Sequence, residues 1–291
     1  MADQNDIKKA DQDDIKMEDQ IEDQMVDQNE IKIGTHGEQY GNWMSNPFLG
    51  MIGGIGAATA VLMVLFLAVW HLKVLGIIFA IATAVMVVML IWFLWLRRQY
   101  AYGGGGIMDR VHRALIPYLD FDGEGTILEV GCGSGPLAVR CALTWPKAKV
   151  IGLDYWGISF DYNKELCEKN AMLEGVGDRC TFVRGDARDL DMPDESVDAV
   201  ISNYVYHNIA GADRKELLLE SLRVLKKGGV FALHDDMKPN LYGDMEAFAQ
   251  KLRDMGYSEV ELVDTRETIF GSEAKANAVM LGGSRLLRGR K

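Results

Sequence analysis

The stretch ILEVGCGSG, residues 127–135, places a carboxylate and then three glycines at every second position. The residues Thr126 to Val130 are mostly apolar and partly β-branched, which predicts a buried parallel strand. Glycines after such a strand form a turn where backbone approaches a ligand closely. We therefore predict a nucleotide site here. Its residues are Glu129, Gly131, Cys132, Gly133 and Gly135.

The residue after this turn helps to decide which class of nucleotide the site binds. The dinucleotide fingerprint has its third glycine one place beyond Gly135, where this chain has Pro136. Proline suits the first turn of a following helix. A carboxylate such as Glu129 at a strand end is poorly suited to a pyrophosphate. The pattern favours a ligand that carries positive charge.

Polar and aromatic residues also follow the next three predicted strands. An acid 19 residues after the last glycine of the turn can bind ribose hydroxyls through its two oxygens. The two aromatic residues after it offer a flat face to a base. Because the carboxyl ends of parallel strands meet at one edge of a sheet, these residues are expected near the same ligand. They are Asp154, Tyr155, Trp156, Asp186, Ala187 and Asn203.

A histidine just past the fourth predicted strand is the candidate general base. His207 lies in the stretch NYVYHNI, where Tyr204 and Tyr206 could shape an acceptor pocket. The alternative is a histidine that only packs or orients its loop. The triplet His234 to Asp236 could bind a substrate or a metal, but three adjacent residues enclose a metal poorly, which favours a solvated turn. We predict no metal site.

Strands and helices alternate after residue 106, which predicts a parallel sheet with helices on both faces. One helix has clear boundaries, because Asp213 and Glu216 form a capping box and the stretch from Lys226 to Gly229 supplies basic last-turn residues and a glycine stop. The predicted strands are 126–130, 150–153, 181–183, 199–202, 230–233, 260–263 and 278–281. The predicted helices are 107–119, 136–144, 160–173, the one after Asp213, and 245–255.

The region before this domain contains two apolar runs, residues 48–70 and 74–96, separated by a short turn with His71 and Lys73. Each run has about the 20 residues that cross a hydrocarbon core. The alternative is a buried helical hairpin of a soluble protein, which would keep a polar stripe that these runs lack. Gly50 and Gly54 would let helices pack closely in lipid, within the hairpin or between copies of the chain.

Charge beside the apolar runs predicts their orientation. Arg97 and Arg98 end the second run and are the densest positive charge next to it, so they should face the cytoplasm. Both termini and the domain at 107–291 are then cytoplasmic, after a glycine-rich linker at 99–106. The four cysteines form no CxxC pair, which favours reduced packing residues over disulfides or metal ligands.

Residues 1–46 form an acidic tail in which an Asp-Gln pair recurs every eight residues. The period of eight matches no helical repeat, which favours disorder, as either an interaction tail or a solvated spacer. Its 12 acids and 4 lysines give a net charge of −8 out of −11 for the whole chain. The acidity therefore says little about the domain that follows, and nucleic acid is not an expected partner.

Taken together, the motifs from residue 104 onward resemble a class I S-adenosylmethionine-dependent methyltransferase. The resemblance is strong over residues 125–237, weak over 238–291, and does not extend to 1–103. The matching pieces are the glycine turn with Glu129, the acid Asp154, the turn Gly185-Asp186-Ala187, the strand Asp198 to Asn203, and the turn Leu225 to Gly229.

The resemblance implies a fold, a cofactor and a set of contacts. It implies a Rossmann-like, seven-stranded, mostly parallel sheet whose last strand, here 278–281, runs antiparallel. Glu129 and the glycine turn would surround the methionine end of S-adenosyl-L-methionine and Asp154 the ribose. Asp186 and Ala187 would hold the adenine edge, and Tyr155 or Trp156 would cover the base.

Two functions follow from this reading. In the first, an active methyltransferase is anchored by two spans, which precede the α/β domain, and acts on a small-molecule or lipophilic acceptor at the cytoplasmic face. In the second, the domain binds the cofactor without turnover and serves as a sensor or scaffold. The full set of cofactor residues favours the first.

Overall fold

A computed structural model describes residues 31–102, 106–157 and 162–291. The described residues form two compact units. A sheet unit contains residues 31–40, 109–156 and 162–291, and a hairpin unit contains 41–102, 106–108 and 157. The predictions for residues 1–30, for the glycines at 103–105 and for a helix start at residue 160 lie outside the described part. Residues 31–40, which we predicted within the acidic tail, instead bury Ile31, Ile33 and Tyr40 in the sheet unit.

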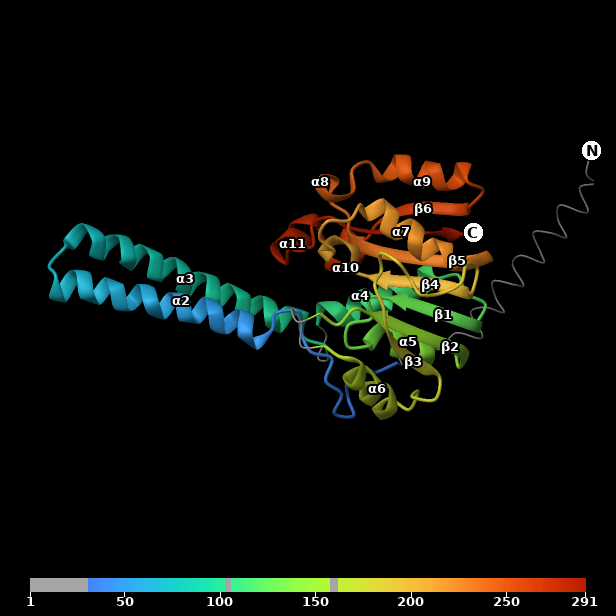
Figure 1. Cartoon of the computed structure of the whole chain (residues 1–291), viewed down its shortest axis with the longest axis horizontal. Helices are drawn as coiled ribbons and strands as arrows, with labels where there is room; N and C mark the ends of the chain where they lie inside the picture. Colours follow the sequence, from blue (N-terminus) through green and yellow to red (C-terminus); the bar gives the residue numbers. More distant parts are fainter. Residues whose placement is uncertain (1–30, 103–105, 158–161) are drawn as a thin grey trace, which may run out of the picture. The chain divides into compact units, whose positions relative to one another are not determined.

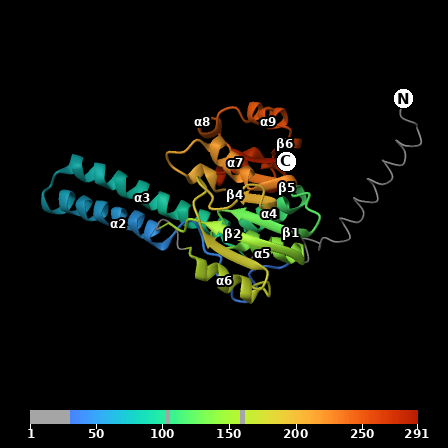
Figure 2. The ribbon, with the colours of Figure 1, turned by 45° about the vertical axis from the view of Figure 1, so that its right-hand side comes forward.

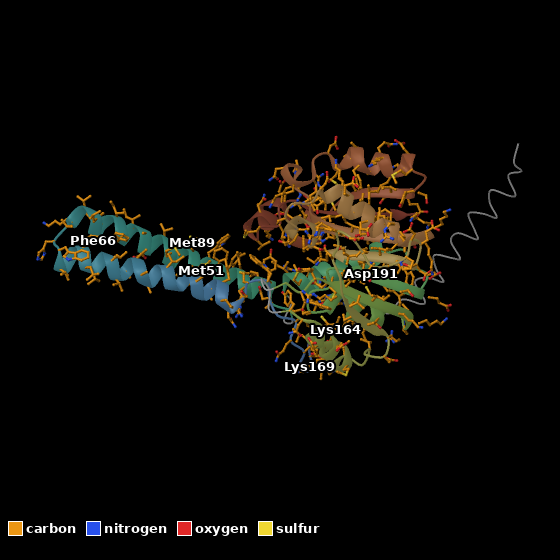
Figure 3. All side chains as sticks on the ribbon, in the orientation of Figure 1. Met51, Phe66, Met89, Lys164, Lys169 and Asp191 are labelled. Carbon is orange, nitrogen blue, oxygen red and sulfur yellow. The ribbon has the colours of Figure 1, made fainter. Side chains whose placement is uncertain are left out.

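The hairpin unit consists of two long apolar helices (Figure 1). Helix α2 (Asn46–Val64) continues through a π-helical turn, η1 (Leu65–Val69), and α3 (Lys73–Tyr100) returns beside it. By length and composition both helices could cross a membrane. Their apolar side chains are mostly exposed, Met51 and Met89 among them. Figure 3 draws the side chains along both helices and labels these two. This exposure argues against the core hairpin of a soluble protein.

Specific contacts join the two helices. The Thr83 hydroxyl donates to Thr59 Oγ1 at 3.1 Å, and the rings of Phe66 and Phe79 stack with centroids 5.3 Å apart. A Cβ built at Gly50 or Gly54 would meet no described atom within 4 Å. The predicted close packing at these two glycines is therefore wrong within the hairpin.

The sheet unit is built on seven strands, and the predicted fold class is confirmed. Their order is β3-β2-β1-β4-β5-β7-β6, with β7 antiparallel to both of its neighbours and the other pairs parallel. Figures 1 and 2 show the strands side by side. The strands are β1 (Glu124–Val130), β2 (Lys147–Asp154), β3 (Cys180–Arg184), β4 (Val197–Asn203), β5 (Leu225–Asp236), β6 (Ser258–Asp264) and β7 (Ser284–Arg290).

The antiparallel strand is not where the sequence placed it. Ala278 ends a short helix and residues 279–281 follow it, and the last strand is β7, whose sequence is SRLLRGR. Leu286 and Leu287 are fully buried there, while Arg288 pairs with Glu261 on β6 and Arg290 with Asp120. A long arginine side chain can pack its methylene groups against the sheet while its guanidinium reaches an acidic partner. The arginines therefore obscure the apolar pattern by which a strand is predicted from the sequence.

Helices cover both faces of the sheet. Neighbouring residues of a strand point to opposite faces. Leu128 of β1 packs in the same core as Leu222 and Leu252, whereas Glu129 accepts a hydrogen bond from the Ala138 amide on the opposite face. The helices are α4 (Ile107–Leu115), η2 (Ile116–Tyr118), α5 (Pro136–Thr144), α6 (Lys164–Leu173), η3 (Tyr206–Asn208), α7 (Arg214–Arg223), α8 (Pro239–Tyr242), α9 (Met245–Asp254), α10 (Arg266–Phe270) and α11 (Glu273–Ala278).

The helix predicted after Asp213 begins as expected and ends earlier. The Asp213 side chain caps α7 by accepting from the Lys215 amide at 2.8 Å. Lys226 to Gly229 lie within β5 instead. A Cβ at Gly229 would come within 2.8 Å of the Asp198 carbonyl oxygen on β4. Gly229 therefore lets two strands approach closely and does not stop a helix.

Helix α4 is held against α5 by a buried carboxylate. Asp109 Oδ1 accepts from Arg140 Nη2 at 2.7 Å, and its other oxygen pairs with Arg113. The Arg140 side chain is fully buried, so removing Asp109 would leave a buried charge without its carboxylate. This attachment sets the position of His112 on the same helix, which reaches the end of β4.

Candidate active site

The glycine turn lies at the carboxyl end of β1, as predicted. Gly131, Gly133 and Gly135 all have positive φ, at 77°, 56° and 89°. A Cβ at Gly131 would come within 2.1 Å of the Val205 side chain, so both backbone conformation and space require glycine there. The Gly131 and Cys132 amides donate to the Leu153 carbonyl oxygen at 2.7 and 3.0 Å, which ties the turn to the end of β2.

Glu129 is the most unusual carboxylate of the site. Its residue is 3 % exposed, and its Oε2 atom has no hydrogen-bond partner among the described residues. Burial raises the pKa of Glu129 from 4.5 to about 8, although the Ala138 amide donates a hydrogen bond to it. A buried carboxylate that lacks donors is costly, so this position suits a ligand that brings positive charge and N–H groups.

Asp154 bridges two parts of the turn. Its Oδ2 accepts from the Gly133 amide at 2.9 Å and its Oδ1 from the Trp156 amide at 2.7 Å. The Trp156 indole donates to the Gly133 carbonyl oxygen at 2.8 Å. Tyr155 is instead 56 % exposed, with the Arg184 guanidinium 5.3 Å from its ring centroid. Of the two aromatic residues predicted to cover a base, Trp156 is the one at the glycine turn.

The acid after β3 has a partner that the sequence did not suggest. Asp186 accepts hydrogen bonds from the backbone and the guanidinium of Arg188, which lower the pKa of its carboxyl. The Ala187 side chain beside it is buried. The Asp186–Arg188 pair is solvent-accessible, so a ligand can share or replace it at low cost.

Asn203 at the end of β4 is engaged by two histidines. Its Nδ2 lies 3.1 Å from His112 Nε2 and its Oδ1 lies 2.8 Å from His234 Nδ1. Burial lowers the pKa of each histidine to about 3, so both rings are neutral at pH 7. Both polar atoms of the Asn203 side-chain amide are therefore already bound inside the protein, at the position of the predicted cofactor contact.

The triplet His234 to Asp236 is not the solvated turn that we predicted. All three residues lie in β5, which extends beyond the apolar run at 230–233, and all three are buried. His234 Nε2 lies 2.8 Å from Thr265 Oγ1 and 3.0 Å from Ser284 Oγ, and the latter lies 2.6 Å from the Tyr204 hydroxyl. A chain of neutral polar groups thus lies beneath the ends of β4 and β5.

His207 and Asp235 form a hydrogen-bonded pair next to this chain. His207 Nδ1 contacts Asp235 Oδ1, and the His207 amide donates to Asp235 Oδ2 at 3.0 Å. The Tyr242 hydroxyl donates to the same Oδ2 at 2.7 Å. Burial alone would lower the pKa of His207, but the hydrogen bond and charge of Asp235 outweigh it and raise that pKa. The His207 side chain remains 24 % exposed, so a reactant can reach it.

Tyr206 and the cysteines near the site pack in the interior of the domain. Tyr206 is fully buried, and its hydroxyl lies 2.9 Å from Ser221 Oγ, so it does not line a pocket. Cys167 donates its thiol to the Gly133 carbonyl oxygen at 3.2 Å beneath the glycine turn. All four cysteines are free and buried, as expected for packing residues, and burial raises the pKa of Cys132 and Cys141.

The site therefore has two halves at one edge of the sheet. The glycine turn, Glu129, Asp154 and Trp156 meet at the ends of β1 and β2, and His207 with Asp235 lies at the ends of β4 and β5. The fold and this arrangement define a nucleotide-binding α/β domain. Residues 128–233 match the family described as a methyltransferase domain. Over this region the chain carries a class I S-adenosylmethionine-dependent methyltransferase domain, as the motifs predicted.

Curated relatives agree with this assignment. The chain is 32 % identical over 127 residues to a sterol 24-C-methyltransferase of Aspergillus fumigatus, which covers 44 % of this chain and 32 % of that protein. It is 33 % identical over 135 residues to a demethylmenaquinone methyltransferase of Symbiobacterium thermophilum, with 46 % and 51 % covered. It is 39 % identical over 132 residues to a fatty-acid O-methyltransferase of Mycolicibacterium smegmatis, with 45 % and 43 % covered. The matched regions thus cover about a third to a half of these relatives.

Solved structures share the fold. The [4+2]-cyclase SpnF has a TM-score of 0.50 and 20 % identity, and the match covers 62 % of this chain and 80 % of that one. A geranyl diphosphate methyltransferase in complex with GPP and sinefungin has a TM-score of 0.50 and 14 % identity, with 67 % and 82 % covered. At these identities the likeness concerns the fold alone.

Proposed function

We propose that the protein is a membrane-anchored S-adenosylmethionine-dependent methyltransferase that acts on a small or lipophilic acceptor at the cytoplasmic face. The observation that carries the proposal is the buried Glu129 carboxylate, whose Oε2 has no donor among the described residues. The cofactor carries an ammonium group on its methionine end. An ammonium supplies both the charge and the N–H donors that this carboxylate lacks.

The other residues of the first half fit the remainder of the cofactor. The two carboxylate oxygens of Asp154 now accept from the Gly133 and Trp156 amides. When these hydrogen bonds open, the same oxygens can accept from the ribose hydroxyls. The Trp156 ring would cover the base, and Asp186 with Ala187 would receive its edge. When bound, S-adenosylmethionine supplies a methyl group that is already activated on a sulfonium.

The second half of the site provides the base. His207 would accept the proton that an acceptor hydroxyl or amine loses, and Asp235 would hold the imidazole in one orientation. Asp235 itself is fixed by the Tyr242 hydroxyl and by its own chain, because it also accepts from the Asp236 amide at 2.6 Å. The acid thus positions the ring, and His207 touches the reactant.

A lipophilic acceptor is supported by two independent features. The relatives above are named for action on a sterol, a demethylmenaquinone and a fatty acid. The two apolar helices would place the domain at the surface of the bilayer where such acceptors are found. The anchor would then bring enzyme and acceptor to the same compartment.

Methyl transfer by the purified full chain tests the proposal. The protein in detergent or nanodiscs is incubated with methyl-labelled S-adenosylmethionine and separate membrane and soluble extracts of the source cells. We expect label in an organic-soluble product that depends on the membrane fraction. Cofactor binding without label transfer to any fraction would favour the silent sensor or scaffold instead.

Replacing Asp154 with Ala should weaken S-adenosylmethionine binding by about 1–3 kcal/mol, the range for hydrogen bonds to a charged group. Isothermal titration calorimetry on the full chain measures the change. Asp154→Asn is the matched variant, since it keeps one oxygen and should lose less than Ala. An unchanged dissociation constant for both variants would remove Asp154 from the cofactor site.

We expect both termini and the sheet unit to lie in the cytoplasm, because Arg97 and Arg98 end α3 and outnumber the single Lys73 of the turn between the helices. Single cysteines placed at His71, Arg98 and Lys291 are labelled in intact cells with a membrane-impermeant maleimide. Only the cysteine at position 71 should react. Labelling at position 291 from outside would contradict the orientation.

A further inference from the structure

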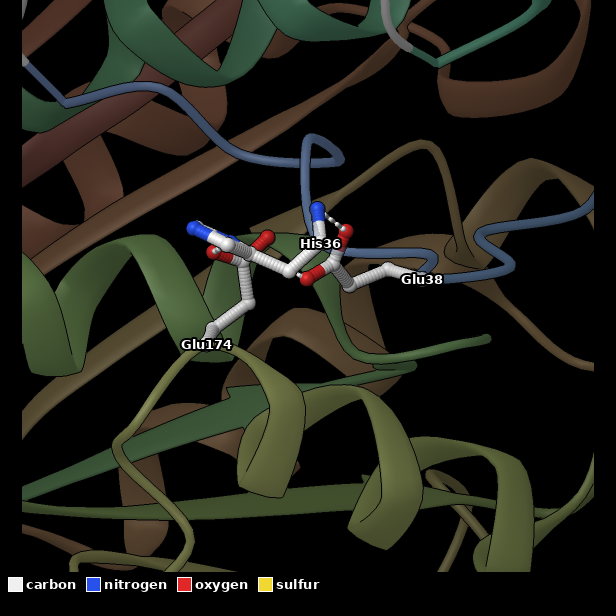
Figure 4. A group of neighbouring side chains, drawn as sticks. All are labelled: His36, Glu38 and Glu174. Carbon is white, nitrogen blue, oxygen red and sulfur yellow. Dashed lines mark hydrogen bonds and ion pairs between the residues drawn. The ribbon is translucent and has the colours of Figure 1, made fainter.

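Three side chains from two distant parts of the chain meet at the end of α6 (Figure 4). His36 and Glu38 come from the stretch before α2, and Glu174 caps α6. His36 Nδ1 lies 3.3 Å from Glu38 Oε1 and 3.5 Å from Glu174 Oε2, and the three atoms all lie within 4.8 Å of one another. We propose that this cluster binds a divalent transition-metal ion of the zinc type.

Burial of the two carboxylates is the first argument. The Glu38 and Glu174 side chains are 0 % and 2 % exposed, although the His36 side chain is 60 % exposed. Glu38 Oε2 accepts from the His36 amide at 2.7 Å, but Glu38 Oε1 accepts no hydrogen bond from any described residue. A buried carboxylate oxygen that faces an imidazole nitrogen and lacks a donor is an open ligand position.

A metal ion would satisfy the polar atoms of this cluster better than an ion pair between His36 and the two carboxylates. The Nδ1 atom of a protonated His36 carries one N–H, which cannot point at two carboxylate oxygens on different residues with good geometry. A neutral His36 offers the lone pair of Nδ1 instead, and the Thr35 hydroxyl at 3.4 Å is a distant donor for it. A cation placed between the three atoms would satisfy all of them at once.

The ligand types and the two distances from His36 Nδ1 favour one kind of metal. Tetrahedral zinc with bonds of about 2.0–2.2 Å holds its ligand atoms about 3.3–3.6 Å apart, which includes both distances from His36 Nδ1. Calcium and magnesium prefer about six or more oxygen ligands, which one imidazole and two carboxylates do not provide. The exposed side of His36 leaves the fourth position to water.

A metal at this site would hold the segment 33–40 against the glycine turn. Glu174 Oε1 already accepts from the Gly34 amide at 2.7 Å and the Tyr40 hydroxyl at 3.0 Å. The Ser134 hydroxyl, in the glycine turn, donates to the Tyr40 carbonyl oxygen at 2.5 Å, and Asn170 Nδ2 donates to the Ser134 carbonyl oxygen at 3.0 Å. A metal at Glu174 adds a strong link to these hydrogen bonds.

Cobalt titration of the tag-free full chain in detergent tests the site without any cofactor or acceptor. Co²⁺ should bind as one ion per chain with visible absorption bands of four-coordinate geometry, and Zn²⁺ should displace it. His36→Ala and Glu174→Gln should each weaken binding at least about tenfold. The matched controls are His71→Ala and Glu165→Gln, which change exposed residues away from the cluster and should bind as the wild type does.

Limited proteolysis supplies the second readout. Zn²⁺ should slow tryptic cleavage after Lys32 several-fold in the wild type and leave the rate unchanged in His36→Ala, whose exposed side chain can be removed without unfolding the domain. Circular dichroism verifies that each variant is folded. Absence of saturable Co²⁺ binding, or equal binding by His36→Ala and the wild type, would overturn the site. Binding without any change in cleavage would overturn its fastening role.

Discussion

Replacing His207 with Gln is expected to lower turnover by about 10²- to 10⁴-fold, while the affinity for S-adenosylmethionine stays within about twofold. The reason is that His207 is partly exposed and oriented by Asp235 at the ends of β4 and β5, whereas the proposed cofactor contacts of Glu129 and Asp154 lie at β1 and β2. Initial rates with saturating cofactor and acceptor measure the effect. His71→Gln is the matched control, since His71 lies outside the sheet unit.

The pH dependence distinguishes a base from a packing residue. A base acts when deprotonated, so the rate should rise with pH through the pKa of His207, which Asp235 holds above its ordinary value of 6.5. Asp235→Asn should lower turnover and move the midpoint of the rise to lower pH. If His207→Gln keeps its activity, or if Asp235→Asn leaves the midpoint in place, His207 is not the base.

The same pair has a consequence for stability. The folded-state pKa of His207 is raised, so its protonation stabilises the fold fully below the unfolded value of about 6.5. That contribution is lost as the pH rises through the raised pKa. The pH at which the base becomes active is therefore the pH at which the ion pair ceases to stabilise the domain.

Replacing Glu129 with Gln should have opposite effects on binding and on the unliganded fold. Cofactor affinity should fall about 10- to 100-fold, because a charged hydrogen bond to the ammonium is lost. Without cofactor, the melting temperature should be unchanged or a few degrees higher. Burial raises the pKa of Glu129 to about 8, so at pH 7 the folded protein must hold a proton that the unfolded chain releases, at a cost of about 3 kcal/mol that a neutral side chain avoids.

The sign of the Glu129 effect can be checked against pH. The raised pKa means that the folded protein prefers the protonated acid, so stability should fall as the pH rises from about 4.5 towards 8. Glu129→Gln should flatten that fall. Glu124→Gln is the matched control on the same strand, because Glu124 is exposed and paired with Lys147. A variant that loses both stability and affinity would show that Glu129 is structural.

Local patterns were sufficient to predict much of the fold and the position of half of the candidate site. The turn at Gly131 to Gly135 and the acid Asp154 could be predicted, because strand ends and glycine spacing are encoded within a few residues. The strand β7 was missed, since its arginines carry polar groups out of a strand whose leucines are buried. The extent of β5 was missed because burial of His234 depends on partners at Thr265 and Ser284.

The remaining site residues depend on contacts between distant segments. Asp235 was placed in a solvated turn, and its pairing with His207 becomes visible only when β4 and β5 are adjacent. His36 and Glu174 are separated by more than a hundred residues, and His36 lies in a stretch that composition assigned to an acidic tail. No short-range pattern relates such residues, so their joint chemistry can be inferred only from the fold.

The buried cysteines make the glycine turn a reporter of its own opening. Cys132 lies inside the turn and Cys167 donates to the Gly133 carbonyl oxygen, so neither thiol can meet a reagent until this region separates. Their alkylation rate therefore counts local opening events of the native protein. A ligand bound at the glycine turn should lower this alkylation rate. The rate therefore reports whether the cofactor site is occupied, even when the acceptor is unknown.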